Sequence, residues 1–241
     1  MEGETSIMQK DRIMITTKSN LFIGGNASTF EIGGIDAYTV VDYEGKPYIP
    51  ASTVKGIFRR IVRDMQAEGD ETANKIKGIY EKNLNQLRDM AQKNYETVET
   101  KSNDYEERKK KLTERYDNEI KKVSAEYLFG IQGFNDTPKL MINDFVLIGE
   151  NKNQLFSIDT KNQIVIKDDK VESNPRTYKT VCPNVTFVGD ILFYGMDDEL
   201  FQAAKMILNQ VFEQLNCGCY RIGNSGSRGY GLVEVKSMDE V

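Results

Sequence analysis

The stretch Ile32–Arg60 reads IGGIDAYTVVDYEGKPYIPASTVKGIFRR and joins a glycine-bearing loop, a proline-bearing segment and a helix start. Pro47 and Pro50 favour an extended backbone, because the pyrrolidine ring fixes φ. Ser52 or Thr53 can then cap the amides of a new helix with a side-chain oxygen. The stretch therefore predicts an extended segment that leads directly into a helix.

Three cations follow closely behind this helix start, at Lys55, Arg59 and Arg60. A helix N-terminus presents free backbone amides, and nearby cations add to its attraction for a phosphate group. The sequence therefore predicts a phosphate-binding site near the start of this helix.

The first half of the stretch predicts a loop with a carboxylate in it. Gly33 and Gly34 allow backbone angles that are closed to other residues and let a ligand approach the main chain. Asp36 follows them, beside Tyr38. A carboxylate near a phosphate site can serve acid–base or metal chemistry. The alternative is that Asp36 only caps a turn, and the spacing leaves both interpretations open.

A second glycine-rich segment lies near the other end of the chain. Tyr220–Val235 reads YRIGNSGSRGYGLVEV, with Arg221 and Arg228 in the glycine-rich part and an alternating strand pattern after it. The part GNSGSRG loosely matches a nucleotide-binding loop, but such loops open a helix, whereas this one precedes a strand. The pattern therefore favours a loop that binds a sugar-phosphate backbone over a loop that binds a free nucleotide.

Taken together, the two segments resemble the RAMP superfamily of CRISPR proteins, in particular the repeated backbone subunit of type III effector complexes. Members of that family carry a G-x-I-D loop, a P-Y-I-P-G-S-S-(L/V)-K-G helix start and a glycine-rich loop that ends in R-G-(Y/F)-G. The matching parts here are Gly33–Asp36, Pro47–Gly56 and Arg228–Gly231. A histidine often stands near the first loop in the family, and the nearest match here is Phe22.

The resemblance implies that the chain binds CRISPR guide RNA and cleaves complementary single-stranded target RNA at regular intervals. It also implies that copies of the chain form a filament along the guide and contact other effector subunits. Asp36 matches the family's cleavage aspartate, and we expect it to hold a divalent cation (Mg²⁺ or Mn²⁺) or to orient a 2′-hydroxyl. A lone carboxylate binds Mg²⁺ weakly, so the RNA must supply further ligands.

The residues that we expect to contact RNA are glycines, hydroxyls and cations of these segments. They are Gly24, Gly25, Ser52, Thr53, Lys55, Arg59, Arg60, Arg176, Lys179, Arg221, Gly223, Gly226, Arg228, Gly229 and Gly231.

Two rival functions stay open. One is a non-catalytic scaffold that holds guide RNA, with Asp36 as a turn residue. The other is a stand-alone endonuclease that trims precursor guide RNA, although many such enzymes use histidine and this chain has none. The lack of histidine also excludes Ser-His-Asp and Cys-His mechanisms.

Composition sets further limits. The net charge of −5 argues against a generic nucleic-acid binder, so the binding charge must be local. The three cysteines form neither a disulfide framework nor a four-ligand zinc set, and we expect them to be buried or half-buried thiols. The chain has no apolar run of about 20 residues and no charged leader, so we expect a cytoplasmic protein without a membrane partner.

Apolar spacing predicts the remaining elements. Residues 1–11 are polar, and we expect them to fray. Within residues 140–149, Asp144 is either a second site carboxylate or a side chain held by backbone amides. The expected strands are 12–18, 140–149, 155–158, 164–167, 185–194 and 231–235, and the expected helices are one from Ser52, 73–98, 105–127 and 198–216.

These elements predict an α+β protein with a ferredoxin-like (RRM-like) core over residues 1–63 and 128–241. Residues 64–127 are expected to form an inserted antiparallel helical hairpin, which either contacts a neighbour or RNA, or simply packs on itself. Residues 150–182 are expected to form a thumb-like β-hairpin with Arg176, Tyr178 and Lys179 at its base. The aromatic signatures of RNA-recognition modules are missing, so base stacking on the sheet is not the expected binding mode.

Overall fold

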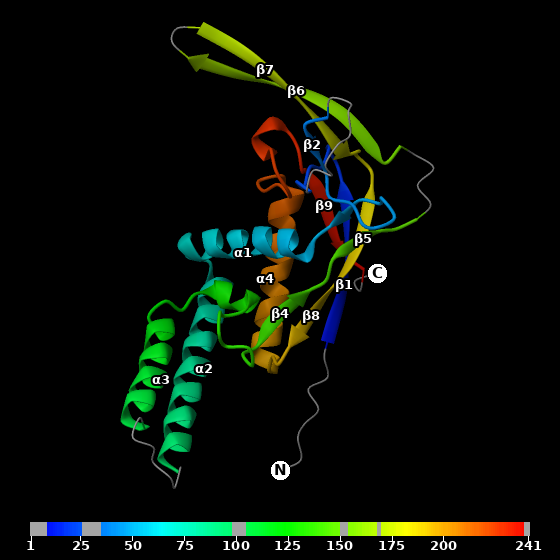
Figure 1. The fold of residues 1–241 in the computed structure, drawn as a ribbon. Helices are drawn as coiled ribbons and strands as arrows, with labels where there is room; N and C mark the ends of the chain where they lie inside the picture. Colours follow the sequence, from blue (N-terminus) through cyan, green and yellow to red (C-terminus); the bar gives the residue numbers. More distant parts are fainter. Residues whose placement is uncertain (1–8, 26–34, 98–104, 150–153, 168–169, 239–241) are drawn as a thin grey trace. The chain divides into compact units, whose positions relative to one another are not determined.

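The computed structural model describes residues 9–25, 35–97, 105–149, 154–167 and 170–238. The chain divides into two compact units. Figure 1 shows the chain coloured from blue at the N-terminus to red at the C-terminus. The first unit contains Met1–Ile61, Leu140–Tyr194 and Asn209–Val241, and the second contains Val62–Lys139 and Gly195–Leu208. Among the described residues, the chain is a mixed α+β protein with four α-helices and mainly antiparallel sheets.

The larger sheet has β8 at its centre and β9 at one edge, and β1 lies between these two and pairs with both. Its strand order is β3-β5-β8-β1-β9, with β4 also paired to β8, and the pairs of β1 are antiparallel. Ile13 and Ile15 alternate with more exposed residues along β1 and are fully buried. The strands are β1 (Gln9–Thr17), β3 (Tyr48–Ile49), β4 (Lys139–Ile142), β5 (Phe145–Leu147), β8 (Thr186–Tyr194) and β9 (Val233–Ser237).

Two helices contribute to the core of this unit. They are α1 (Ala51–Ala67) and α4 (Asp198–Asn216). The first was predicted from the proline-bearing segment that leads into it and the second from its apolar spacing, and both helices are present. The rings of Phe58 and Phe212 lie 5.8 Å apart and are almost fully buried, so the two helices share one apolar contact in the first unit.

The smaller sheet is built on a long hairpin. It has the order β2-β7-β6, with β2 (Ala37–Tyr38), β6 (Phe156–Lys167) and β7 (Lys170–Val181). The expectation of two short strands, 155–158 and 164–167, is wrong, because both ranges fall within the single strand β6. The partner of β6 is β7, which was not expected, and the two pair in antiparallel register over twelve residue pairs. β2 joins the other side of β7 in parallel, with Ala37 opposite Tyr178. This pairing attaches the Asp36 segment to the hairpin.

The second unit is mostly helical. Its elements include α2 (Glu71–Glu96), α3 (Tyr105–Ile120) and the short 3₁₀ helix η1 (Ala125–Phe129). The α2 and α3 helices run side by side in opposite directions, since the Tyr105 hydroxyl donates to the Tyr95 carbonyl and Arg88 pairs with Asp117. The helix expected over 105–127 is too long at its C-terminal end, because α3 ends at Ile120 and the backbone turns there. Residues 98–104, which connect α2 and α3, lie outside the described residues.

Two further expectations about the first unit are corrected by the structure, one at the start of β1 and one over residues 140–149. Residues 9–11 belong to β1 rather than to a frayed end, because they pair with Ile191–Phe193 of β8. The strand expected over 140–149 is split into β4 and β5 around Asn143 and Asp144. Within the part of the chain that the structure describes, no helix is long and apolar enough to cross a membrane.

Candidate functional site

Two glycine-bearing segments from opposite ends of the chain meet in the first unit. The backbone amide of Asn224 donates to the carbonyl of Phe22 at 2.7 Å, and the amide of Gly231 donates to the carbonyl of Asn20 at 2.8 Å. These hydrogen bonds join residues 20–22, which precede Gly24 and Gly25, to the glycine-rich segment Tyr220–Val235.

Glycine is required where the segments touch. Gly223 has φ +81°, and a Cβ on it would lie 2.4 Å from the Phe22 carbonyl oxygen. Gly231 has φ +75°, and a Cβ on it would lie 2.0 Å from the Ile222 carbonyl oxygen. A side chain at either position would therefore need both a disfavoured backbone conformation and a shift of main-chain atoms.

Two adjoining hollows lie beside this contact. They have volumes of about 300 Å³ and 420 Å³ and share Arg60, Arg221 and Gly223. The helix side of the first hollow is one face of α1, because its residues recur at steps of four. The first hollow is lined by Ile23, Ser52, Thr53, Gly56, Ile57, Arg60, Arg221, Gly223 and Asn224, and the second by Arg60, Cys219, Tyr220, Arg221, Gly223, Gly226 and Ser227.

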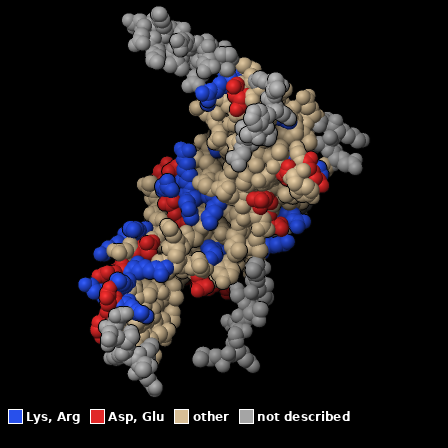
Figure 2. Space-filling view, in the orientation of Figure 1, with Lys and Arg blue, Asp and Glu red and all other residues tan. Residues whose placement is uncertain are grey.

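The shared wall of the hollows is basic. Arg60 is exposed, and its guanidinium carbon lies 5.7 Å from the centroid of the Tyr220 ring. Figure 2 shows Lys and Arg side chains gathered over the part of the surface where α1 lies in Figure 1. Two guanidinium groups, two hydroxyls and a close glycine backbone suit a phosphodiester.

The α1 N-terminus differs from the expectation. The Ala51 amide donates to the Asp144 carboxylate at 2.7 Å, so Asp144 satisfies the first amide of the helix. Ser52 and Thr53 lie inside the first turn and are not its cap, and the Thr53 amide donates to the Pro50 carbonyl at 2.9 Å. Asp144 is therefore held by a backbone amide. Because the Ala51 amide is already used in this way, an anion at the start of α1 would have to bind side chains instead of this amide.

Asp36 is exposed but anchored to the hairpin. Its amide donates to the Thr177 carbonyl at 2.8 Å, and its carboxylate accepts from the Thr177 amide at 2.6 Å. One carboxylate oxygen therefore has a structural role, and its partner is an amide of the distant strand β7 rather than an amide of its own turn. Gly33 and Gly34 lie outside the described residues.

The described residues around Asp36 do not form a cluster of metal ligands. Among the described residues, no group of three or more His, Cys, Asp or Glu side chains could hold a metal ion. Asp36 offers one carboxylate, and one of its oxygens already accepts a hydrogen bond. These residues do not by themselves provide the six or more oxygen ligands that a hard divalent cation needs.

An aromatic cluster packs one residue of the glycine-rich segment against residues from two other parts of the chain. Phe22, Tyr178 and Tyr230 are nearly buried, with ring centroids 5.1 Å apart for Phe22–Tyr178 and 6.5 Å apart for Tyr178–Tyr230. The Tyr230 hydroxyl donates to Asp159 of β6 at 2.5 Å. Burial, reinforced by this hydrogen bond, raises the pKa of the Tyr230 phenol. Tyr230 and Asp159 could not be selected from the sequence, because they lie far apart in the chain and only the fold brings them together.

The remaining predicted residues lie outside the two hollows. Lys179 of β7 lies 4.7 Å from the Phe156 ring centroid, and the Gly25 amide donates to the Tyr38 carbonyl at 3.0 Å. Lys55 and Arg59 are half-buried on a neighbouring face of α1. The predicted residues that do not line either hollow are Gly24, Gly25, Lys55, Arg59, Arg176, Lys179, Arg228, Gly229 and Gly231.

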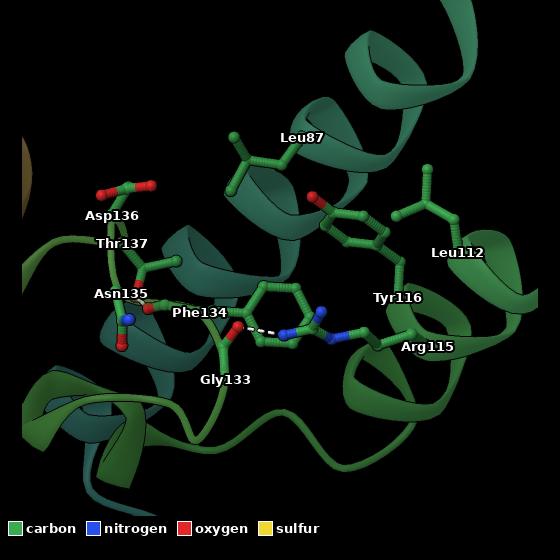
Figure 3. Close-up of a pocket in the computed structure, with 9 residues that line it drawn as sticks. All are labelled: Leu87, Leu112, Arg115, Tyr116, Gly133, Phe134, Asn135, Asp136 and Thr137. Atoms are coloured by element: carbon green, nitrogen blue, oxygen red, sulfur yellow. Dashed lines mark hydrogen bonds between the residues drawn. The ribbon is translucent and has the colours of Figure 1, made fainter. Parts of the chain in front are cut away.

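A different hollow, of about 180 Å³, lies in the second unit between α2, α3 and residues 133–137 (Figure 3). The Arg115 guanidinium donates to the Gly133 carbonyl and lies 4.6 Å from the Phe134 ring centroid. The Tyr116 ring packs edge-on against Phe134 at 5.1 Å. This cation is thus used by the chain itself, and none of the predicted site residues lines the hollow.

Comparisons with known proteins add a family and a fold. A family model described as the RAMP superfamily matches residues 14–234. Among solved structures, the chain is similar to one in the type III-B Cmr-beta complex bound to cognate target RNA, with 22% identity and a TM-score of 0.50. The similarity covers 95% of this chain and 59% of that chain, so this chain spans a little over half of the other's length. No curated protein sequence matches.

Proposed function

Because the chain belongs to the RAMP superfamily, we propose that it is a backbone subunit of a type III CRISPR ribonucleoprotein that binds guide RNA and cleaves complementary target RNA. One observation carries the proposal: Ser52, Thr53 and Arg60 of α1 share a hollow with Arg221 and Gly223 of the glycine-rich segment. In such a complex base pairing selects the target, and the protein needs only to hold the sugar-phosphate backbone.

The hollow supplies what backbone binding needs. Arg60 and Arg221 pair with phosphate oxygens, and the hydroxyls of Ser52 and Thr53 donate hydrogen bonds to the same groups. Because the net charge is −5, affinity depends on these local cations rather than on the overall field. Copies of the chain, aligned along one guide with other effector subunits, repeat this contact at regular intervals.

The topology supports a ferredoxin-like core for this subunit. The strand order β9-β1-β8-β5, with α1 after β1 and α4 after β8, matches a split β-α-β arrangement. In this assignment residues 64–127 are a helical insertion, and the hairpin within 150–182 is a thumb against the guide–target duplex.

Asp36 is the residue that we assign to cleavage. Its carboxylate orients a target 2′-hydroxyl and accepts its proton as that oxygen attacks the adjoining phosphorus. The 5′-oxygen leaves and takes a proton from water, which yields a 2′,3′-cyclic phosphate and a 5′-hydroxyl. A divalent cation here would be held by the Asp36 carboxylate, would need further oxygen ligands from RNA and water, and would supply positive charge beside the reacting phosphate.

Two substitutions at Asp36 test this assignment. Asp36→Asn keeps an acceptor for the Thr177 amide, whereas Asp36→Ala removes it. We expect the guide-loaded Asp36→Asn protein to bind target RNA normally and to lose cleavage by about a hundredfold or more. Asp36→Ala should lose cleavage and also loosen the hairpin.

A non-catalytic scaffold is the second candidate function. It is favoured by the hydrogen bond that already occupies the Asp36 carboxylate. In this case wild-type protein and both variants leave the target RNA intact. Guide binding is tested by co-expression with a guide RNA and gel filtration, and elution as a monomer free of nucleic acid would contradict both functions.

A further inference from the structure

Two exposed cysteines lie side by side at the end of α4. The sulfurs of Cys217 and Cys219 are 3.1 Å apart, and both side chains are exposed. The expectation of buried or half-buried thiols is therefore wrong for this pair, because the chain turns at the surface just after the helix. Cys182 is half-buried, as expected.

The turn after α4 holds the two sulfurs together. The Cys217 amide donates to the Glu213 carbonyl at 2.9 Å and continues the helical pattern. Gly218 follows with φ +79°, the left-handed position that commonly ends a helix, and its amide donates to the Leu215 carbonyl at 3.0 Å. This glycine reverses the chain direction, so the side chains on either side of it approach each other.

We propose that Cys217 and Cys219 form a vicinal dithiol site that peroxide oxidises reversibly to an intramolecular disulfide, and that this modification changes the adjoining basic hollow. The Cys217 thiolate attacks one peroxide oxygen, which gives a sulfenic acid and, after protonation, one water. The Cys219 thiolate then attacks the sulfenic sulfur and releases a second water. The pair loses two electrons, and the peroxide gains them.

The two thiols are suited to these separate roles. The hydrogen bond between the two sulfurs lowers the pKa of the Cys217 thiol and raises the pKa of the Cys219 thiol. Cys217 is thus the more readily ionised nucleophile, and Cys219 is the resolving partner. Closing the bond brings the sulfurs from 3.1 Å to about 2.05 Å, a small movement for an exposed turn. A disulfide in so exposed a turn is easily reduced again.

The site adjoins the hollow through Cys219. This residue lines the same wall as Arg60, Tyr220 and Arg221. Drawing its sulfur toward Cys217 shifts the backbone that leads into Tyr220, whose ring lies against the Arg60 guanidinium. The predicted effect on RNA rests on the function proposed above, whereas disulfide formation does not.

Peptide mapping tests the disulfide directly. Trypsin cuts after Lys205 and Arg221, so both thiols fall in the peptide Met206–Arg221, while Cys182 falls in another. After hydrogen peroxide treatment of the full chain, we expect this peptide to lose two hydrogen atoms, to resist alkylation and to recover with dithiothreitol. In Cys219→Ser, dimedone should instead trap a sulfenic acid at Cys217. If both thiols in peroxide-treated wild type stay alkylatable, or react no faster than Cys182, the proposal is overturned.

A binding measurement tests the coupling. We expect peroxide to weaken guide-RNA binding by wild type about three- to tenfold, to leave the affinity of the Cys217→Ser/Cys219→Ser variant unchanged, and to weaken binding by Cys182→Ser as in wild type. If the disulfide forms and the wild-type affinity does not move, the coupling is overturned and the dithiol site stands. If reduced wild type binds no RNA, the proposed function fails, and the mapping result still decides the dithiol site.

Discussion

Arg228 of the glycine-rich segment lies beside Tyr178 of β7, with Nη1 3.4 Å from the phenol oxygen and the guanidinium carbon 5.8 Å from the ring centroid. The residue before Tyr178 is Thr177, whose amide binds the Asp36 carboxylate. Two motifs from opposite ends of the chain therefore meet at consecutive residues of one strand. This strand fixes where the proposed cleavage carboxylate lies relative to the glycine-rich segment.

Tyr178 should be a main support of this arrangement. It is 6% exposed and packs against Phe22 and Tyr230. We expect Tyr178→Ala to lower the free energy of unfolding by about 3–5 kcal/mol, since a large cavity remains. Tyr178→Phe keeps the ring and loses only the Arg228 partner, at a cost of about 1 kcal/mol. Urea unfolding monitored by circular dichroism measures both losses. Equal losses in the two variants would contradict the view that packing of the Tyr178 ring is the main contribution.

Gly56 offers a test that separates stability from binding. A Cβ on Gly56, in α1, meets nothing within 4 Å, and the residue lines the first hollow. Gly56→Ala should stabilise the helix by about 1 kcal/mol and should weaken RNA binding, because the methyl group enters the hollow. Gly78→Ala in α2 is the matched control, since its Cβ also meets nothing and it does not line the hollow. Thermal unfolding and RNA anisotropy check the pair, and equal RNA affinities would count against the hollow.

Gly223 should be far less tolerant than Gly229. Both have positive φ, at +81° and +90°, but only the Cβ of a residue at 223 would collide with the Phe22 carbonyl. Gly229→Ala should cost about 1–2 kcal/mol from backbone strain alone. Gly223→Ala should cost clearly more, because the two glycine-bearing segments must separate. Denaturation midpoints give the order, and the reverse order would show that the contact at Phe22 is unimportant.

Asp144 should act as the N-terminal cap of α1. Its carboxylate accepts from the Ala51 amide at 2.7 Å. Asp144→Ala should lower the free energy of unfolding by about 1 kcal/mol. Asp144→Asn keeps an oxygen acceptor and should lose less. Guanidinium titrations would measure both losses, and an Asn variant as unstable as the Ala variant would indicate that the charge itself is needed.

Glu234 predicts a dependence of stability on acid. Its carboxylate lies 2.7 Å from the Lys18 ammonium and 2.8 Å from that of Lys236, and the hydrogen bond from Lys18 leads the lowering of its pKa from 4.5 to about 2. The stabilisation is therefore complete above the unfolded value and is lost as pH falls from about 4.5 to about 2.

Glu234→Gln cannot form these ion pairs at any pH. The difference in unfolding free energy between wild type and this variant should thus shrink across that acid window. A difference that stays constant from neutral pH to pH ~2 would contradict the pKa assignment.

Local patterns in the sequence were enough for part of this fold. The apolar spacing predicted α4 over residues 198–216, and the proline-bearing segment placed the start of α1 within one residue. The hairpin was harder, because β6 and β7 contain many polar residues. Their length comes from backbone hydrogen bonds between the strands, and polar side chains do not reveal those.

The candidate site divides in the same way. Arg60, Arg221 and the glycine-rich segment could be selected from the sequence, since their residue types and spacing predict a phosphate-binding surface, and the structure brings them to the same hollows. Lys55 and Arg59 were selected with them but lie on another face of α1. A difference of one residue rotates a side chain by about 100° around a helix, and only packing decides which face is covered.

The sequence by itself determined where α1 begins, the full extent of α4, where glycine permits close backbone contact, and which side chains could bind phosphate. These properties depend on neighbours within a turn or two of the chain. Only the tertiary structure decided that Asp144 caps α1, that Thr177 holds Asp36, and that the sulfurs of Cys217 and Cys219 lie 3.1 Å apart. The first two contacts join residues far apart in the chain and the third depends on the direction of one turn, so each is set by how the elements pack rather than by local preference.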